Sequence, residues 1–187
     1  MIKQFIAIIF ISFSFISCKE KNNEFKSGNN KTKGFIINKE GSFEIKFPES
    51  GNLKADTTTQ LLNDKEVLIY SYNLSTNDPN SLIDGNFGYR VDYSNSDLTQ
   101  EEADSFFNIQ KEYLLSVSNG KLEYEFVLSK PALGRELMIS LIKSNLKTKY
   151  RIFYKNGIIY KLVVVSPAGE HFNSGVKNFL ESFKIYD

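Results

Sequence analysis

The sequence has one cysteine, one histidine and no tryptophan in its 187 residues. A single cysteine excludes an intramolecular disulfide framework, a thiolate cluster for zinc and a redox pair of cysteines within one chain. A single histidine limits any Ser-His-Asp or Cys-His catalytic site to that one residue. Packing alone must therefore hold the core together, and the 10 Tyr and 16 Phe residues predict that this core is aromatic.

The sequence also lacks an excess of charge of either sign, since it has 23 Lys and Arg and 22 Asp and Glu. Removal of Lys3 with an N-terminal leader leaves 22 of each. A nucleic-acid-binding protein usually carries a strongly basic patch, and no DNA- or RNA-binding motif is present, so we expect no nucleic-acid partner. The contents of 41% hydrophobic and 24% charged residues are typical of a globular protein, here one domain with accessory segments.

Motifs for cofactors and metals are absent as well. The glycines are scattered singly, and neither phosphate-binding pattern, G-x-x-x-x-G-K-[ST] or G-x-G-x-x-G, occurs in the sequence. The stretch 92–103 begins like a calcium loop, but it has Asp97 where that loop needs glycine and Ala103 where it needs glutamate. A zinc site would have to combine His171 with carboxylates alone. The sequence therefore predicts no cofactor and no metal.

No apolar run is long enough to cross a membrane as a helix. The N-terminal run from Phe5 to Ile16 is apolar apart from two serines, whereas a spanning helix needs about 20 residues. Lys3 supplies the positive charge that precedes such a run in secretory leaders. Residues 1–17 are therefore predicted to be a cleaved signal peptide.

The residues F-I-S-C at positions 15–18 resemble the lipobox of bacterial lipoproteins. Ile16 and Ser17 fit that pattern, and Phe15 departs from its usual leucine-like residue. The resemblance implies that the Cys18 thiol takes a diacylglyceryl group and that cleavage frees the Cys18 amine for a further acyl chain such as palmitate. Two or three acyl chains anchor a protein durably. The alternative is an ordinary secretory leader with a chance cysteine near its cut site.

The residue after the cysteine bears on the location. Lys19 is not the aspartate that the resemblance associates with retention in the inner membrane. We therefore expect a lipid-anchored protein of the cell envelope, in the outer membrane. Residues 18–41 that follow are rich in Asn, Lys and Gly, and such a segment buries too little apolar surface to fold, which predicts a flexible tether. The apolar triplet 35–37 leaves the boundary between tether and domain open by several residues.

From residue 42 onward, alternation of apolar and polar side chains predicts β-strands. Phe43, Ile45 and Phe47 share one face of the first strand. The next strands form a hairpin that turns at residues 63–64 and places 68, 70, 72 and 74 on one face. A strand at 87–93 follows, and four more are expected at 121–128, 135–142, 149–157 and 158–165, the last two joined by an Asn-Gly turn.

Two helices complete the predicted domain. The first starts at Thr99 with Glu102 in a capping box, presents apolar residues up to Val117 to the core and ends at Gly120. The second starts at residue 173 or 174 and continues to Phe183 with apolar residues at helical spacing. The pattern predicts a single α+β domain over residues 42–187, an antiparallel β-sheet flanked by two helices.

Several parts of this domain resemble the PsbP-like fold family. They are the opening F-E-I-K-F-P, the middle helix, the hairpin Y-R-I-F-Y-K-N-G-I-I-Y-K-L-V-V and the closing V-K-N-F-L-E-S-F-K-I. That family includes extrinsic photosystem subunits, a Ran-binding nuclear transport factor and small bacterial lipoproteins. The resemblance covers residues 42–187 and implies a binding or assembly role without chemistry of its own. It transfers no functional residue.

Two sets of residues are candidates for a site. His171 lies in the loop S-P-A-G-E-H-F-N-S before the last helix, without a G-x-S-x-G motif at any serine. The last predicted hairpin is basic and is interleaved with tyrosines, which fits either a solvated sheet face or a surface for a ligand or partner. Its members are Lys147, Lys149, Arg151, Lys155 and Lys161, with Tyr150, Tyr154 and Tyr160 between them.

These observations favour a lipid-anchored, extracytoplasmic binding or assembly-accessory module with an unknown partner and no catalytic activity. One alternative is an envelope hydrolase that uses carboxylates or His171. Another is a carrier of a small molecule or lipid, which would need a cavity of about 300 Å³ or more between sheet and helix.

Overall fold

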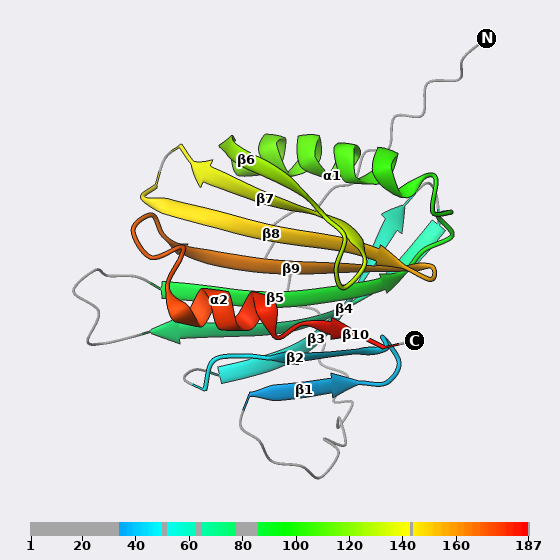
Figure 1. Cartoon of the computed structure of the whole chain (residues 1–187), viewed down its shortest axis with the longest axis horizontal. Coiled ribbons are helices and arrows are strands. Elements are labelled where there is room, and N and C mark those ends of the chain that lie inside the picture. Colours follow the sequence, from blue (N-terminus) through cyan, green and yellow to red (C-terminus); the bar gives the residue numbers. More distant parts are fainter. Residues whose placement is uncertain (1–33, 50–51, 63–64, 78–85, 143, 187) are drawn as a thin grey trace.

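The computed structural model describes residues 34–49, 52–62, 65–77, 86–142 and 144–186. These residues form two antiparallel sheets and two helices, which confirms the predicted α+β class (Figure 1). The prediction of one sheet is corrected to two, because the strand at Phe43 pairs outside the large sheet. The predicted signal peptide 1–17, the lipid site Cys18 and the turn at 63–64 lie outside the described residues.

The large sheet has seven strands in the order β3-β4-β5-β9-β8-β7-β6. Every pair of neighbours is antiparallel. The Asn-Gly hairpin between β8 and β9 is confirmed, with positive φ of 51° at Asn156 and 76° at Gly157, as this two-residue turn requires. In sheet order the strands are β3 (Asn52–Leu62), β4 (Lys65–Asn77), β5 (Asn86–Asn95), β9 (Ile158–Pro167), β8 (Leu146–Lys155), β7 (Leu133–Leu141) and β6 (Gly120–Leu128).

The small sheet has three strands and joins the two ends of the described chain. Its middle strand is β2 (Phe43–Lys46), paired with β1 (Phe35–Asn38) on one side and with β10 (Lys184–Ile185) on the other. β1 lies within residues 18–41, for which a tether was predicted, and it forms the four pairs Phe35↔Lys46 to Asn38↔Phe43. Ordered structure therefore includes the apolar triplet at 35–37.

Helix α1 (Ala103–Ser118) starts later than Thr99, where it was predicted to start. The expected capping box is present, because the Glu102 carboxylate accepts from the Thr99 backbone N–H at 2.8 Å and from the Thr99 hydroxyl at 2.9 Å. These bonds close a turn that precedes the helix, and the bond from Phe106 N–H to the Glu102 carbonyl, at 2.9 Å, begins the helical ladder. The box therefore sits one turn before the helix.

Helix α1 ends at a left-handed residue, as predicted, but this residue is not the expected one. Asn119, with φ 45° and ψ 47°, takes the position expected for Gly120. Gly120 instead begins β6, where a Cβ atom would lie 2.3 Å from Ile139 Cγ2. The glycine is needed for close packing against β7. Val117, predicted to face the core, is 52% exposed in this last turn, where the chain leaves the helix for β6.

Helix α2 (Ser174–Glu181) is confirmed where the sequence predicted it. The Asn173 side chain accepts from the Val176 backbone N–H at 2.8 Å and so caps the first turn. The apolar residues Val176, Phe179 and Leu180 are buried, as their helical spacing indicated. The helix lies on the same side of the large sheet as the small sheet (Figure 1).

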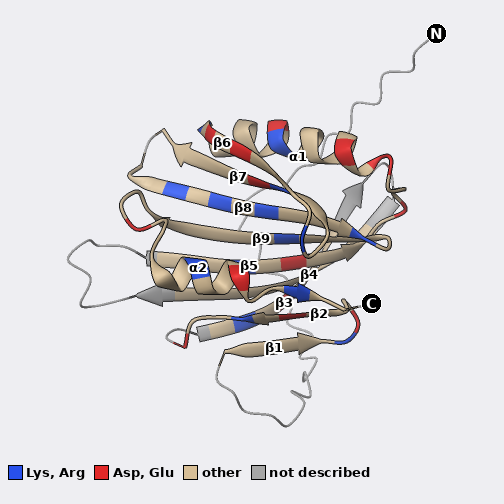
Figure 2. Ribbon diagram, in the orientation of Figure 1, with Lys and Arg blue, Asp and Glu red and all other residues tan. Residues whose placement is uncertain are grey.

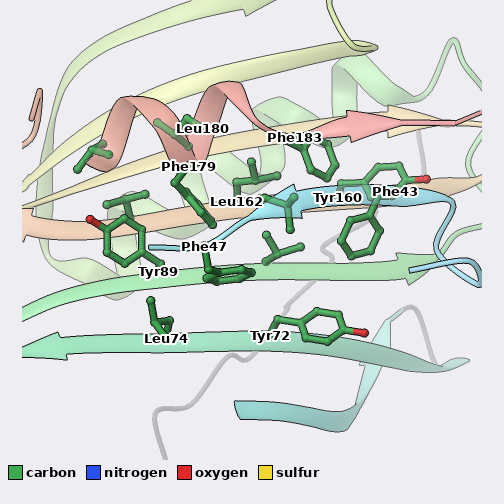
Figure 3. Packing of buried hydrophobic residues seen from close by; sticks show 14 of the residues in the cluster. Phe43, Phe47, Tyr72, Leu74, Tyr89, Tyr160, Leu162, Phe179, Leu180 and Phe183 are labelled. Atoms are coloured by element: carbon green, nitrogen blue, oxygen red, sulfur yellow. The ribbon is translucent and has the colours of Figure 1, made fainter. Parts of the chain in front are cut away.

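Two apolar cores lie on opposite faces of the large sheet. The main core joins β4, β5 and β9 to β2 and α2, and Figure 3 shows Phe179 pointing from α2 toward Phe47, directly after β2, with ring centroids 5.0 Å apart. The second core packs α1 against β7 and β8. Alternation along β8 sends Phe153 into the main core and Ile152 and Tyr154 into the second core. Strand β8 is thus covered by apolar residues on both faces.

Candidate functional site

A cavity of about 190 Å³ lies beside α2, at the edge of the main core. Its walls are formed by β8, by α2 and by the segment that precedes α2. The sheet contributes Lys149 and Arg151, and the α2 side contributes His171, Phe172, Val176, Lys177, Leu180 and Glu181. The cavity brings the lone histidine and two residues of the predicted basic hairpin together, which their distance in the sequence did not indicate.

Strand alternation places the charged residues of this site on one face of β8. Figure 2 shows Lys and Arg repeated along this strand. Lys147, Lys149 and Arg151 point to the α2 side, whereas Tyr154 between Arg151 and the turn packs toward α1. Lys161 of the predicted basic hairpin lies opposite Ile152, on the α1 side. The predicted cluster of five cations is therefore divided between two faces of the sheet.

Arg151 is held by partners on both sides of the cavity. Its Nε donates to Glu136 Oε2 on β7 at 2.5 Å, and its Nη1 donates to the Leu180 carbonyl at the end of α2 at 3.0 Å. Glu136 Oε1 accepts in turn from the Tyr124 hydroxyl at 3.0 Å. Burial, together with the charge of Glu136, raises the pKa of Tyr124. The positive charge of Arg151 is thus compensated, and the residue ties α2 to the sheet.

Lys147 is also paired, further along the same face. Its Nζ donates to Glu123 Oε2 at 2.7 Å, and the Ser140 hydroxyl donates to the other oxygen of that carboxylate. The hydrogen bonds from Lys147 and Ser140 lower the pKa of the Glu123 carboxyl. This pair leaves no free cation at its end of the face.

Lys149, between these two pairs, is different. Lys149 is only 7% exposed, and its Nζ lies 4.5 Å from the centroid of the Phe172 ring. Within the described residues, no hydrogen bond or ion pair to Lys149 is formed. Burial lowers the pKa of the Lys149 amine, because it disfavours the charged form. The cavity is therefore lined by a buried lysine that contacts the face of an aromatic ring and feels the charge of Glu136 without forming an ion pair with it.

His171 lies at the entrance to α2 and is partly buried. Its Nδ1 contacts the Ala168 carbonyl, and because a carbonyl oxygen can only accept, Nδ1 is the donor in this contact. Its ring lies 4.1 Å from that of Phe172. In the described part of the chain, no carboxylate or serine hydroxyl forms a hydrogen bond with the imidazole. The histidine is thus not assembled into the arrangement that the hydrolase alternative requires.

A second group of charges lies on the α1 side of the large sheet. Asp92 of β5 lies opposite Lys161 of β9 and also contacts Arg90 and Ser71. Asp92 lies on the face of β5 opposite the apolar residues Val91 and Tyr93, yet it is only 4% exposed. This group is a compact ion-pair network within the sheet and borders no cavity of the described site.

The cavity beside α2 is smaller than the roughly 300 Å³ expected for a carrier. Over the described ranges, no three His, Cys, Asp or Glu residues gather in a way that could hold a metal ion. In the same ranges, no helix combines the length and the apolar character needed to traverse a bilayer.

No protein-family model matches the sequence, and no curated protein matches it.

Proposed function

We propose that this protein is a lipid-anchored binding or assembly-accessory module of the cell envelope, held in the outer membrane through Cys18 and without catalytic activity of its own. The lipobox-like residues at 15–18 support the anchor. We further propose that the domain is PsbP-like. The order of its elements, from β2 through α1 and the β8–β9 hairpin to α2, supports this, since these are the segments that resemble the family.

The observation that carries the binding role is the cavity beside α2. Its walls combine apolar side chains with a buried lysine that lacks a counter-ion among the described residues, which is a binding rather than a structural arrangement. Its histidine hydrogen-bonds a backbone carbonyl and, among the described residues, no carboxylate, which supports binding over acid–base chemistry. Binding without chemistry is the role that fits both facts.

The anchor is tested with Cys18→Ala in the full chain. We expect the unaltered protein to fractionate with membranes and to carry the added mass of two or three acyl chains, whereas Cys18→Ala loses both. Ser17→Ala is the matched control, since alanine is also a small residue at that position and should keep the lipid. An unchanged membrane fraction and mass for Cys18→Ala would refute the anchor.

The partner is tested by crosslinking the anchored protein in cells and identifying the crosslinked residues by mass spectrometry. An assembly role predicts crosslinks from the domain to one defined envelope protein. Crosslinks that are abolished when the protein is released by Cys18→Ala would show that anchoring places the domain beside its partner. A pattern of weak crosslinks to many abundant proteins, the same with and without the anchor, would speak against assembly.

A further inference from the structure

We infer that the cavity beside α2 binds a small carboxylate that carries an apolar group, with the Lys149 ammonium facing the carboxylate and Phe172, Val176 and Leu180 facing the apolar group. The inference rests on the proposed binding function and assigns its ligand class. It follows from the charge, the walls and the size of the cavity.

The charged residues that line the cavity favour a ligand with one negative charge. Arg151 is already paired with Glu136, and Lys177 at the rim lies 4.0 Å from Glu181 on the same helix. Lys149 is the lining cation that forms no ion pair or hydrogen bond with a described residue, and the nearby charge of Glu136 is shared with Arg151. A buried ammonium is stabilised by a hydrogen-bonded anion, whereas a second negative charge in the ligand would face Glu181 across the same cavity. A monoanion is therefore favoured over a dianion.

The apolar residues that line the cavity favour a ligand with an apolar group next to its negative charge. Val176 and Leu180 of α2 are 1% and 4% exposed and line the cavity from one side. Phe172 is 68% exposed, although its ring lies over Lys149 and borders the cavity. An exposed aromatic ring at the mouth of a cavity gains contact area when a ligand covers it. A simple inorganic anion would leave this apolar surface in water.

The size of the cavity limits the ligand. Sites for drug-sized molecules have volumes of about 300–1,000 Å³, and this cavity has about 190 Å³. A ligand with one carboxylate and one ring or short branched chain is of the matching size. A phospholipid is too large to be enclosed.

The inference is tested with the purified, anchored full-length protein in a non-ionic detergent, by titration calorimetry with four probes. Phenylacetate has both features, acetate lacks the ring, phenylacetamide lacks the charge and inorganic phosphate lacks the apolar group. We expect phenylacetate to bind at one site and the other three probes to bind at least about tenfold more weakly. Phenylacetamide loses a hydrogen bond between charged groups, which is worth about that factor. Acetate and phosphate lose the burial of the apolar ring.

Two lysine variants distinguish binding in the cavity from a general effect of surface charge. Lys149→Met keeps the aliphatic volume and removes the charge, and we expect it to weaken phenylacetate binding about tenfold or more. Lys184→Met, at a side chain that is 68% exposed and does not line the cavity, is the matched control and should change the affinity less than about threefold. The thermal midpoint of Lys149→Met should not fall, since the variant removes a desolvated charge, so lost binding would not mean lost folding.

Several results would overturn the inference. They are no saturable binding of phenylacetate, equal binding by Lys149→Met, or tighter binding of phosphate or phenylacetamide than of phenylacetate. Each leaves the anchor and the partner tests of the proposed function untouched, since those depend on Cys18 and on crosslinks in cells. If all four probes fail but the crosslinks identify one partner, the ligand class is wrong and the binding role remains.

Discussion

Lys161 of β9 places its Nζ 3.1 Å from Asp92 Oδ2 on the neighbouring strand β5. Arg90 Nε lies 2.5 Å from the other oxygen of this carboxylate, and the Ser71 hydroxyl donates to it at 2.7 Å. Burial opposes ionisation of Asp92, but the charges of Lys161 and Arg90 and the hydrogen bonds outweigh it and lower the pKa of Asp92. Asp92 is therefore a buried anion on which two cations depend.

Replacement of Asp92 by asparagine should destabilise the fold strongly. Removing one member of a buried ion pair leaves the remaining charges uncompensated, which lowers the free energy of unfolding by about 3–5 kcal/mol. Asp104→Asn is the matched control, since Asp104 pairs with Arg135 at 2.9 Å but its side chain is 62% exposed, and such a pair is worth about 0–1 kcal/mol. Urea unfolding followed by circular dichroism measures both, and equal effects would show that the Asp92 network is not structural.

Alkaline pH should unfold the protein through its buried tyrosines. Burial raises the pKa of Tyr89 and of Tyr160 to about 12 from the ordinary value of 10.0. Between these values the folded state keeps phenolic protons that the unfolded state releases, so the free energy of unfolding is full below about pH 10 and falls as pH rises toward 12. Urea midpoints at pH 9, 10 and 11 measure the slope.

Tyr160→Phe is the control for this pH dependence. It removes one titrating group along with the hydrogen bond from the Tyr160 hydroxyl to the Gly41 carbonyl, at 2.9 Å. The variant should be less stable at pH 8 by about 1 kcal/mol and should show a shallower loss of stability above pH 10. A stability that does not change between pH 9 and pH 11 would contradict the assignment of raised pKa values to the buried tyrosines.

A methyl group at Gly120 should also be destabilising. The added Cβ would lie 2.3 Å from Ile139 Cγ2 and 2.7 Å from the Ser118 hydroxyl oxygen, and overpacking of this kind lowers the free energy of unfolding by about 1–3 kcal/mol. Gly169→Ala is the control, because no atom lies within 4 Å of its added Cβ. Denaturant midpoints of the two variants should therefore differ clearly, and a Gly120→Ala variant as stable as Gly169→Ala would show that β6 and β7 are further apart than described.

Truncation of Phe183 tests the link between the C-terminus and the main core. Its side chain is 4% exposed and its ring lies 5.7 Å from that of Phe43 and 5.6 Å from that of Phe153. Phe183→Ala should lower the free energy of unfolding by about 3–5 kcal/mol. Phe126→Ala, at a residue that is 57% exposed, should change it by less than about 1 kcal/mol. The same urea experiment decides, and similar losses for both variants would be inconsistent with this core.

Local pattern was enough to predict much of this fold. Period-two alternation identified the buried face of β5, and helical spacing identified the buried face of α2. The same information could have predicted that Lys161 and Lys149 lie on different faces of the sheet. A two-residue turn at Asn156-Gly157 requires Lys161 to lie opposite Ile152. Alternation along β8 then puts Ile152 and Lys149 on opposite faces.

Other features depend on contacts between distant parts of the chain. β1 and β10 have four and two residues, too few for a periodic pattern, and they are strands because β2 lies between them. The burial of Lys149 depends on α2 and on the approach of Phe172, neither of which is near β8 in the sequence. Leu68 shares one face of its strand with Tyr72, but it is 49% exposed whereas Tyr72 is buried. Such outcomes are set by tertiary packing and not by local preference.

The position of β2 has a consequence for the order in which the protein can fold. The first and the last strands of the described chain both pair with it, and the Tyr186 backbone N–H donates to the Ser42 carbonyl at 2.8 Å. Because synthesis runs from the N-terminus, β1 and β2 are made well before β10, and the small sheet gains its third strand only when residues 184–185 are available. Phe183 directly precedes β10 and packs in the main core. We therefore expect the main core to be completed only after β10 has paired with β2.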